Sequence, residues 1–427
     1  EQAGIFHRKI LEVPFSLDHP YWVEDENFDI EYHVRHIALP KPGDWRQLMI
    51  QISRLQSHEL DKTRPLWEAY IIEGLDNVGR LPKGCFALYM KMHHATIDGV
   101  SGAALQAAIH DLEPLAPADA DFVPAIRDLS GATPSTAELL ARSTVNNLAK
   151  SAKLFLGLGS AIPRLMKAKM AAPKGDDVEV PSTVFNRGRV TANRVIDGRQ
   201  FALDDVRAIA ASQPDTKIND VALAVVSGAM RMYLDAKDDL PEQSLIAACP
   251  LNVRTDQSAN ADNMVSMMST HLCTDIADPA KRLRAIVDGS RNAKEFTEIL
   301  GADTLALIPM NLPAFLARNL MPPLIDLAVR LDAVMFNTIV SNVAGIQQPL
   351  YFCGAQMVSM YGVGPIVDKA GLFHADFSYD VKITFTLTAC REMLPDPEFY
   401  AQCLQALSLI HISEPTRLEK SSRMPSS

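Results

Sequence analysis

The residues best suited to chemistry in this sequence are two adjacent histidines, His93 and His94, followed by Asp98 and Gly99 in the pattern H-H-x-x-x-D-G. A neutral imidazole near pH 7 can accept a proton from a hydroxyl or thiol while that group attacks a carbonyl carbon. The pattern therefore predicts a general base. The sequence has no G-x-S-x-G segment, which favours direct transfer to an acceptor hydroxyl over a covalent serine intermediate.

The elements around the histidines are expected to hold them at the end of a strand. Residues 85–90 form an apolar run that predicts a buried strand, and the small residues of 102–109 predict a helix. Successive strand side chains point to opposite faces, so we expect one histidine to face a cavity and the other to pack. Asp98 is expected to pair with a cation and fix the turn, while Gly99 permits a backbone conformation that a Cβ would resist.

Two less specific interpretations of the histidine pair are core packing and metal binding. Metal is disfavoured because neighbours on opposite faces cannot easily bind one ion, and no H-x-x-x-H or C-x-x-C completes a ligand set. Packing stays open as the alternative to a general base. Four other histidines have no motif around them and are expected to be structural or surface residues: His33, His36, His271 and His374.

Asn219 and Asp220 precede the apolar stretch 221–233, which predicts a helix. One interpretation is that either residue is the N-cap, whose side chain accepts a hydrogen bond from the first free backbone N–H groups. The other is that the Asn219 amide or a neighbouring N–H supports a developing oxyanion. Both interpretations stay open from the sequence.

Composition indicates a large cytoplasmic protein. With 427 residues, two or three domains are expected, and the net charge of −10 argues against nucleic acid as a partner. The six scattered cysteines indicate reduced core residues rather than a disulfide framework, and no secretory signal is visible. The most apolar region, 305–336, is broken by prolines and charges and predicts no membrane-spanning helix.

Changes in composition along the chain predict the domain bounds. We expect a first domain at 1–112, with a strand at 9–13 and a helix at 45–60, a linker at 113–193, and a second mixed domain at 194–409 that ends in a helix over 396–409. Residues 410–427 include a Ser- and Lys-rich stretch that indicates a non-native tail.

The linker contains a basic and apolar segment at 138–170, expected to be helical with interruptions at Gly157, Gly159 and Pro163. One interpretation is a covering helix that ties the two domains together. The other is a peripheral contact with a membrane or lipid droplet, where basic residues meet anionic headgroups and apolar residues enter the interface. Both stay open.

The H-H-x-x-x-D-G pattern resembles that of the CoA-dependent acyltransferase superfamily, which includes chloramphenicol acetyltransferase and peptide-synthetase condensation domains. Further segments in the same order resemble motifs of the bacterial wax ester synthase/acyl-CoA:diacylglycerol acyltransferase family: P-L-W at 65–67, N-D at 219–220, P-x-x-V-R at 250–254 and S-N-V at 341–343. The resemblance covers roughly residues 4–409. Ala344 and Ile346 stand where this family usually has prolines, and by resemblance a leading helix and strand are missing.

The resemblance implies an α/β fold of two chloramphenicol-acetyltransferase-like domains, joined by a helical linker, with an active-site channel between them. It implies an O-acyltransferase that moves a long-chain acyl group from acyl-CoA to diacylglycerol, a long-chain alcohol, or both, giving triacylglycerol or wax ester. Acyl-CoA is then a substrate, and no metal or bound cofactor is implied. The implied location is the cytoplasm, with peripheral contact with the inner membrane or lipid inclusions as the open possibility.

The same resemblance assigns roles to individual residues. His94 deprotonates the acceptor hydroxyl and, once protonated, donates to the leaving sulfur. The expected catalytic residues are His94, His93, Asp98, Gly99 and Asn219, and the expected substrate-binding residues are Trp67, Asp220, Ser341 and Asn342. Trp67 is expected to pack near the channel mouth.

Two rival functions remain. One is another acyltransferase with the same motif, such as a condensation domain, which is disfavoured because the chain carries no carrier domain. The other is a non-catalytic lipid-surface protein, which the intact motif disfavours.

Overall fold

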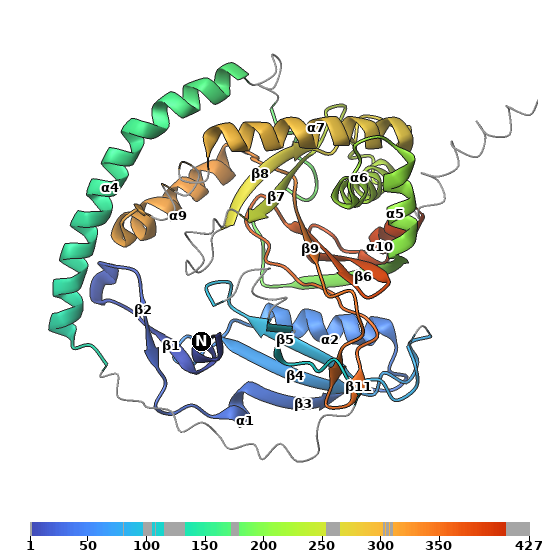
Figure 1. The fold of residues 1–427 in the computed structure, drawn as a ribbon, viewed down its shortest axis with the longest axis horizontal. Coiled ribbons are helices and arrows are strands. Elements are labelled where there is room, and N and C mark those ends of the chain that lie inside the picture. Colours follow the sequence, from blue (N-terminus) through green and yellow to red (C-terminus); the bar gives the residue numbers. More distant parts are fainter. Residues whose placement is uncertain are drawn as a thin grey trace, which may run out of the picture.

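Two β-sheets with helices packed around them form the body of the protein in the computed structural model (Figure 1). The structure describes residues 2–79, 81–96, 105, 106, 108–114, 133–171, 179–252, 265–301, 304, 307 and 311–406. Asp98, Gly99, half of the predicted helix 102–109, most of the predicted connection 113–135 and the predicted tail 410–427 lie outside these residues. The predicted α/β fold is confirmed, whereas the predicted domain bounds and the channel between the domains stay predictions.

The N-terminal half is built on a three-stranded sheet of order β3-β4-β5, in which β3 and β4 are parallel and β5 is antiparallel to β4. A separate antiparallel pair, β1 and β2, precedes it. The elements are η1 (Gln2–His7), β1 (Arg8–Leu11), η2 (Pro14–Ser16), β2 (Tyr21–Glu24), α1 (Ile30–His33), β3 (Val34–Ala38), α2 (Trp45–Ser57), β4 (Trp67–Glu73) and β5 (Ala87–Met92). The strands predicted at 9–13 and 85–90 and the helix predicted at 45–60 are therefore present with shifted ends.

A capping box explains why α2 begins at Trp45. The carboxylate of Asp44 accepts a hydrogen bond from the N–H of Gln47 at 2.8 Å, and the Gln47 side chain accepts one from the N–H of Asp44 at 3.3 Å. This reciprocal pair satisfies backbone donors that the first helical turn leaves free. The helix then packs Leu48 and Met49 into the core of the N-terminal half.

The linker helix α4 (Thr136–Ala171) is continuous over 36 residues, so the predicted interruptions at Gly157, Gly159 and Pro163 are wrong. At Gly157, packing outweighs the local cost. A Cβ on Gly157 would lie 2.2 Å from a methyl carbon of Leu307, so glycine allows close approach there. Most helical stability in proteins comes from such tertiary contacts rather than from propensity.

The C-terminal half is built on a six-stranded mixed sheet of order β6-β13-β12-β9-β7-β8. Strands β12, β9 and β7 run parallel to one another, and the other neighbours are antiparallel. Its elements are β6 (Arg194–Ala202), α5 (Leu203–Ser212), α6 (Ile218–Ala236), β7 (Ile246–Asn252), β8 (Val265–His271), α7 (Pro279–Leu300), α9 (Ala314–Arg330), β9 (Thr338–Ala344), β10 (Tyr351–Phe352), β11 (Ala355–Gln356), β12 (Leu372–Tyr379), β13 (Lys382–Cys390) and α10 (Pro397–Ala406).

One face of the six-stranded sheet carries the largest core. Helices α5, α6, α7 and α10 pack there, and α6 is buried along most of its length. The predicted helix 221–233 lies within α6, and the predicted helix 396–409 corresponds to α10, whose last residues lie beyond the described part of the chain. All six cysteines are free, and four of them are buried, whereas Cys353 is exposed. Reduced core residues were therefore predicted correctly for most of the six.

The edge strand β6 of this sheet meets the N-terminal half. The indole N–H of Trp45 in α2 donates to the carboxylate of Asp197 in β6 at 2.8 Å, and its ring lies 5.0 Å from the ring of Tyr361. Ile196 and Val363 also join the core of the N-terminal half. Strand β6 and the segment that contains Tyr361 and Val363, both from the C-terminal half, thus complete the core of the N-terminal half.

The most apolar region predicted from the sequence contains α9, which has 17 residues and includes Pro322 and Pro323. Across the part of the chain that the structure describes, no helix is both long enough and apolar enough to span a bilayer.

Candidate active site

The histidine pair lies in a turn directly after β5. The backbone N–H of His93 donates to the carbonyl of Leu66 at 3.0 Å, and the backbone N–H and hydroxyl of Thr96 both donate to the carbonyl of His93, at 2.9 and 2.6 Å. The strand ends at Met92, so strand alternation does not separate the two rings, and the expectation that one of them is packed is wrong. Both side chains are exposed because the chain turns away from the sheet before it reaches them.

The two rings nevertheless have different surroundings. The Nδ1 of His93 accepts a hydrogen bond from the N–H of Ala95 at 3.1 Å, which requires an unprotonated Nδ1 and leaves the proton on Nε2. Partial desolvation lowers the pKa of His93, and the nearby Lys62 and His94 lower it further. His93 is thus engaged in closing its own turn, whereas the exposed ring of His94 lies one residue further along it.

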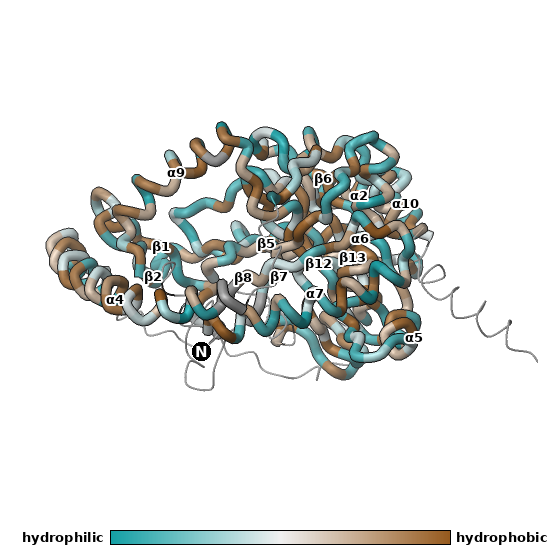
Figure 2. The backbone as a smooth tube through the Cα atoms, turned by 90° about the horizontal axis from the view of Figure 1, so that it is seen from above, coloured by the Kyte–Doolittle hydropathy of each residue, from teal (hydrophilic) through white to brown (hydrophobic). Residues whose placement is uncertain are grey.

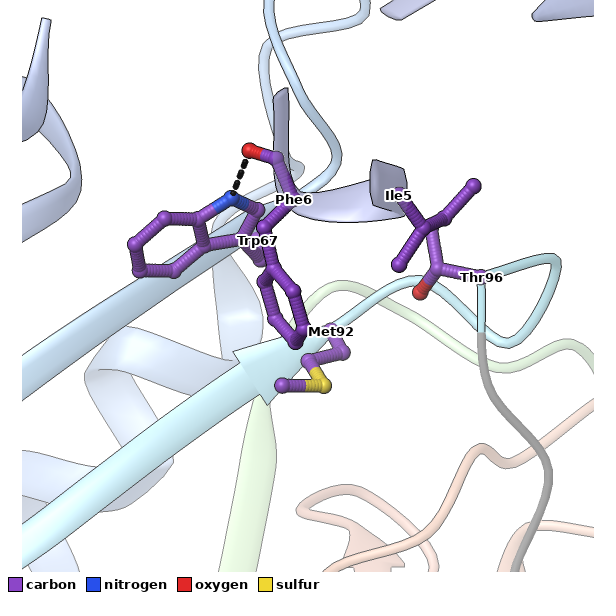
Figure 3. Close-up of a pocket in the computed structure, with 5 residues that line it drawn as sticks. All are labelled: Ile5, Phe6, Trp67, Met92 and Thr96. Carbon is purple, nitrogen blue, oxygen red and sulfur yellow. Dashed lines mark hydrogen bonds between the residues drawn. The ribbon is translucent and has the colours of Figure 1, made fainter. Parts of the chain in front are cut away.

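A small, mostly apolar pocket lies beside this turn (Figure 3). Met92 and Thr96, which flank the histidine turn, supply part of its wall. The rest comes from β4 and η1, and the five lining residues are Ile5, Phe6, Trp67, Met92 and Thr96. With a cavity volume of only about 10 Å³, the pocket forms an apolar wall next to the histidines rather than a space for a whole hydrocarbon chain.

Trp67 is the most firmly held residue of the pocket wall. It is the first residue of β4, and its indole N–H donates to the carbonyl of Phe6 at 2.8 Å, as the dashed line in Figure 3 shows. The Phe6 ring meets it edge-on with centroids 5.5 Å apart, and the ring of His33 stacks on it at 4.5 Å. Trp67 is packed, as predicted, whereas its expected place near a channel mouth stays a prediction.

Asn219 and Asp220 lie inside α6, not before it. The helix begins at Ile218 and the N-cap position is Lys217, so the prediction that Asn219 or Asp220 is the N-cap is wrong. The carboxylate of Asp220 accepts the backbone N–H of Lys217 at 2.8 Å, which is the reciprocal half of a capping box and also places a negative charge at the positive end of the helix. Asn219 is half-buried in the same first turn.

Ser341 and Asn342 lie near the C-terminal end of β9. In the parallel register with β12, Ser341 is opposite Ala375 and Asn342 is opposite Asp376. Ser341 is half-buried and Asn342 is exposed. The structure therefore brings together the histidine pair and Trp67, and it places Asn219, Asp220, Ser341 and Asn342 on the half that contains the six-stranded sheet.

Motif analysis missed His33 as a partner of the site. It is fully buried, and its Nδ1 lies 2.7 Å from the carbonyl oxygen of Trp67. No sequence signal identifies it, because it is 34 residues away from Trp67 and belongs to no motif. Phe6 and Ile5 were missed for the same reason, whereas Met92 could have been found as the immediate neighbour of the histidine pair.

His374 was expected to be structural, and its environment agrees. It is fully buried in β12, with Nδ1 3.0 Å from the hydroxyl of Thr338 and Nε2 2.8 Å from the hydroxyl of Tyr400. Burial lowers the pKa of His374 to about 3. Two residues along the same strand, burial raises the pKa of Asp376 well above its usual value, and neither of its carboxyl oxygens has a hydrogen-bond partner among the described residues.

Comparison with known proteins covers nearly the whole chain. Residues 1–222 match the model of the wax ester synthase/diacylglycerol acyltransferase catalytic domain, and residues 261–411 match that of the WS/DGAT C-terminal domain. A Mycobacterium tuberculosis protein named as a diacylglycerol O-acyltransferase is 34% identical over 90% of this chain and 82% of its own length. The O-acyltransferase WSD of Acinetobacter baylyi is 33% identical over 90% of this chain and 81% of its own length.

A solved structure is similar over the same extent. The wax ester synthase/diacylglycerol acyltransferase from Marinobacter aquaeolei VT8 superposes with a TM-score of 0.66 at 28% sequence identity. The match covers 96% of this chain and 85% of the Marinobacter chain.

Proposed function

Since this chain belongs to the wax ester synthase/diacylglycerol acyltransferase family, we propose that it transfers a long-chain acyl group from acyl-CoA to the hydroxyl of diacylglycerol or of a long-chain alcohol. The family is the one that the sequence motifs predicted. One relative is named for diacylglycerol, and the names of the matching catalytic-domain family and of the Marinobacter structure include both wax ester synthase and diacylglycerol acyltransferase, so the proposal includes both acceptors. The products are triacylglycerol and wax ester.

The observation that carries the mechanism is the turn after β5. The His93 ring accepts the backbone N–H of Ala95 within that turn. His94, whose side chain is exposed, lies along the chain between Met92 and Thr96, which both line the apolar pocket. A base beside an apolar wall suits a reaction between two substrates with hydrocarbon chains. His94 is therefore the proposed general base, and His93 is proposed to hold the turn that aims it.

The proposed reaction is a direct transfer. His94 takes the proton of the acceptor hydroxyl, whose oxygen attacks the thioester carbonyl and forms a tetrahedral intermediate. The carbon–sulfur bond then breaks, and protonated His94 returns its proton to the sulfur, so that CoA leaves as the free thiol. No step passes through a metal or a bound cofactor. Asp98 is proposed to pair with a cation and fix the turn, and Gly99 is proposed to permit the backbone conformation that the turn requires, as the sequence predicts.

We assign the support of the tetrahedral oxyanion to Asn219. Its position in the first turn of α6 favours this role, because backbone N–H groups at a helix N-terminus lack partners within the helix and create positive potential. Ser341 and Asn342, near the C-terminal end of β9, are proposed to bind substrate.

The test is a thiol-release assay with palmitoyl-CoA, in which the acceptor is diacylglycerol, hexadecanol or neither. Thiol release that requires an acceptor, together with the matching ester as product, is the expected result. The ratio of rates with the two acceptors defines the specificity. If a folded protein releases no thiol with diacylglycerol and none with hexadecanol, the proposed function is contradicted.

We also propose that α4 and α9 form a lipid-facing surface, here called the α4–α9 flank. The two helices lie on the same side of the molecule in both overall views, and apolar segments are visible on both in Figure 2. Their exposed large apolar residues are Val145, Leu148, Phe155, Leu156, Leu158, Ile162 and Met166 on α4 and Phe315, Leu316, Leu320, Met321, Leu324, Ile325 and Leu327 on α9. Exposed apolar surface on this scale is typical of an interaction site.

The charges of α4 favour an anionic lipid surface as the partner. Lys153 and Lys167 are exposed on this helix, where they can meet anionic headgroups while their apolar neighbours enter the interface. Lys150 has a different role, because it pairs with Asp18 at 2.9 Å. This ion pair ties α4 to the N-terminal half, and α4 also contacts α7 in the C-terminal half. Both contacts support the covering-helix interpretation, so α4 can cover the two halves and also meet a lipid surface.

A further inference from the structure

His33 occupies the centre of an aromatic cluster behind the pocket. It is the last residue of α1 and is fully buried. Its ring stacks on Trp67 with centroids 4.5 Å apart and planes 19° apart, and on Phe28 at 5.2 Å and 15°. The ring of Tyr32 meets it edge-on at 5.2 Å. Packing on this scale leaves the imidazole one orientation.

A hydrogen bond fixes which nitrogen of His33 carries the proton. Nδ1 lies 2.7 Å from the carbonyl oxygen of Trp67, and a carbonyl only accepts, so Nδ1 must be the donor. Burial lowers the pKa of His33, which keeps the ring neutral with Nε2 unprotonated. Nε2 is buried and has no hydrogen-bond partner among the described residues. An unpartnered buried nitrogen is unfavourable, so packing alone would be better served by phenylalanine.

The carbonyl that His33 binds belongs to the strand end that holds the histidine turn. Trp67 is the cross-strand partner of Met92, the last residue of β5. The preceding carbonyl, that of Leu66, accepts the backbone N–H of His93 at 3.0 Å. His33 therefore holds Trp67 in place through its carbonyl, while the carbonyl of the preceding residue, Leu66, anchors His93. A shift of this strand end moves both the pocket wall and the turn.

We infer that His33 is a positioning residue for the proposed acyl transfer, acting through the carbonyl and ring of Trp67 on the turn that carries His94. This inference rests on the proposed function. His33 does not touch the reacting atoms. Its Nδ1–H bond fixes the end of β4, and its ring fixes the indole that lines the pocket.

Two substitutions separate the bond from the stack. His33→Phe keeps an aromatic ring but removes the donor, and His33→Asn keeps a donor near the position of Nδ1 but removes the ring. Misplacement of a catalytic group by about 1 Å can reduce the rate a hundredfold, so His33→Phe is expected to lower kcat by at least about tenfold. The KM for palmitoyl-CoA is expected to change by less than about twofold, since substrate binding is not the function inferred. His33→Asn is expected to recover part of the lost kcat.

The matched control is His374→Phe, which replaces another fully buried neutral histidine by the same residue, away from the pocket. It is expected to lower the melting temperature while kcat per folded molecule stays unchanged. A purely structural role for His33 would give this same pattern in His33→Phe and would overturn the inference.

A measurement on the unaltered chain covers the case in which both His33 variants unfold. In ¹⁵N-histidine NMR spectra near pH 7, His33 is expected to be neutral with its proton on Nδ1. A proton on Nε2 would mean that the bond to Trp67 does not exist and would overturn the inference. Failure of the proposed function is recognised separately, because the parent chain would then release no thiol from palmitoyl-CoA with either acceptor. An inactive His94→Ala beside a fully active His33→Phe would reject only the role of His33.

Discussion

His94 and His374 are the same residue type in two opposite settings. His94 lies in an exposed turn after β5, an edge strand of the three-stranded sheet, beside a small apolar pocket. His374 lies within β12, in the interior of the six-stranded sheet, and both of its nitrogens are within hydrogen-bond distance of hydroxyl groups. Burial holds the pKa of His374 to about 3, so it does not gain a proton near neutral pH.

The difference shows what a histidine needs in order to act as a base. A ring whose nitrogens are both bonded inside a core has no site for a substrate proton, whereas a ring at the end of a short strand can meet a substrate. The position relative to the sheet, rather than residue type, thus separates a chemical histidine from a structural one.

The largest expected effect is on catalysis. His94→Ala removes the proposed base and should lower kcat by roughly a hundred to ten thousand-fold, the usual contribution of one positioned acid–base group. Its thermal melt should match that of the parent, because the side chain is exposed. Acyl-CoA-dependent ester formation and a thermal melt of the same preparation check both statements. Near-normal turnover by folded His94→Ala would show that His94 is no more chemical than the structural His374.

His374→Phe should give the reverse pattern. It leaves the buried hydroxyl of Tyr400 without its hydrogen-bond partner, whereas the hydroxyl of Thr338 keeps the carbonyl of Leu372 as an acceptor at 3.0 Å. One such loss costs about 1–3 kcal/mol, so the free energy of unfolding should fall by about that amount. Denaturant unfolding measures this loss, and the rate per folded molecule should be unchanged. A lower kcat at full folding would show that the six-stranded sheet influences the chemistry.

The pH dependence of stability should sharpen the contrast further. Because the folded-state pKa of His374 is lowered from 6.5 to about 3, its contribution to stability is complete above about pH 6.5 and is lost as the pH falls towards 3. The slope from this one group can reach about 1.4 kcal/mol per pH unit. Unfolding measured between pH 7 and pH 4 should show this slope in the parent chain and a shallower one in His374→Phe. Equal slopes in the two proteins would mean that His374 is not the buried neutral group.

The part of the structure predicted from sequence follows from local patterns. The strand before the histidines, the helix after Asp44 and the core of α6 are each marked by hydrophobic periodicity or by a cap. The continuity of α4 was not predictable, since it depends on contacts such as that between Gly157 and Leu307, which are distant in the chain.

The candidate site shows the same limit. The H-H-x-x-x-D-G pattern identifies His93 and His94 because their neighbours in sequence are also their neighbours in the turn. His33 reaches the site only because β3 lies beside β4 in the sheet. The spacing of residues in the sequence does not predict that pairing. The start of α6 was misplaced by about a turn because Asp220 has the residue type of a cap but acts at the third helical position.

Asp376 offers a smaller effect of opposite sign. Its pKa is raised by burial, so its contribution to stability is complete below its usual pKa and is lost as the pH rises through the folded-state value. Asp376→Val removes a buried group without partners and should stabilise the protein by about 1–3 kcal/mol at pH 7. The gain should increase between pH 4 and pH 8 in denaturant unfolding. A destabilised Asp376→Val would indicate that the carboxyl has a structural partner.

The smallest expected effect concerns the α4–α9 flank, which belongs to neither histidine setting. Binding to anionic vesicles should weaken with salt, because exposed charges are screened beyond about 10 Å at 0.1 M. Changing both Lys153 and Lys167 to Gln should weaken it further, while turnover of substrates in detergent micelles stays the same. Lys150→Gln serves as the comparison, since it breaks the ion pair with Asp18 instead. Salt-independent binding, or none, would leave α4 as a covering helix only.

The contacts of Trp45 have a consequence for the order in which the protein is made. Its partners Asp197 and Tyr361, and the core residues Ile196 and Val363, are all synthesised 150 or more residues after it. During translation the first sheet therefore leaves the ribosome with an apolar side that nothing yet covers, the condition under which nascent chains aggregate or require chaperones. Production of this protein should thus depend on expression temperature and chaperone supply more than its finished core would indicate.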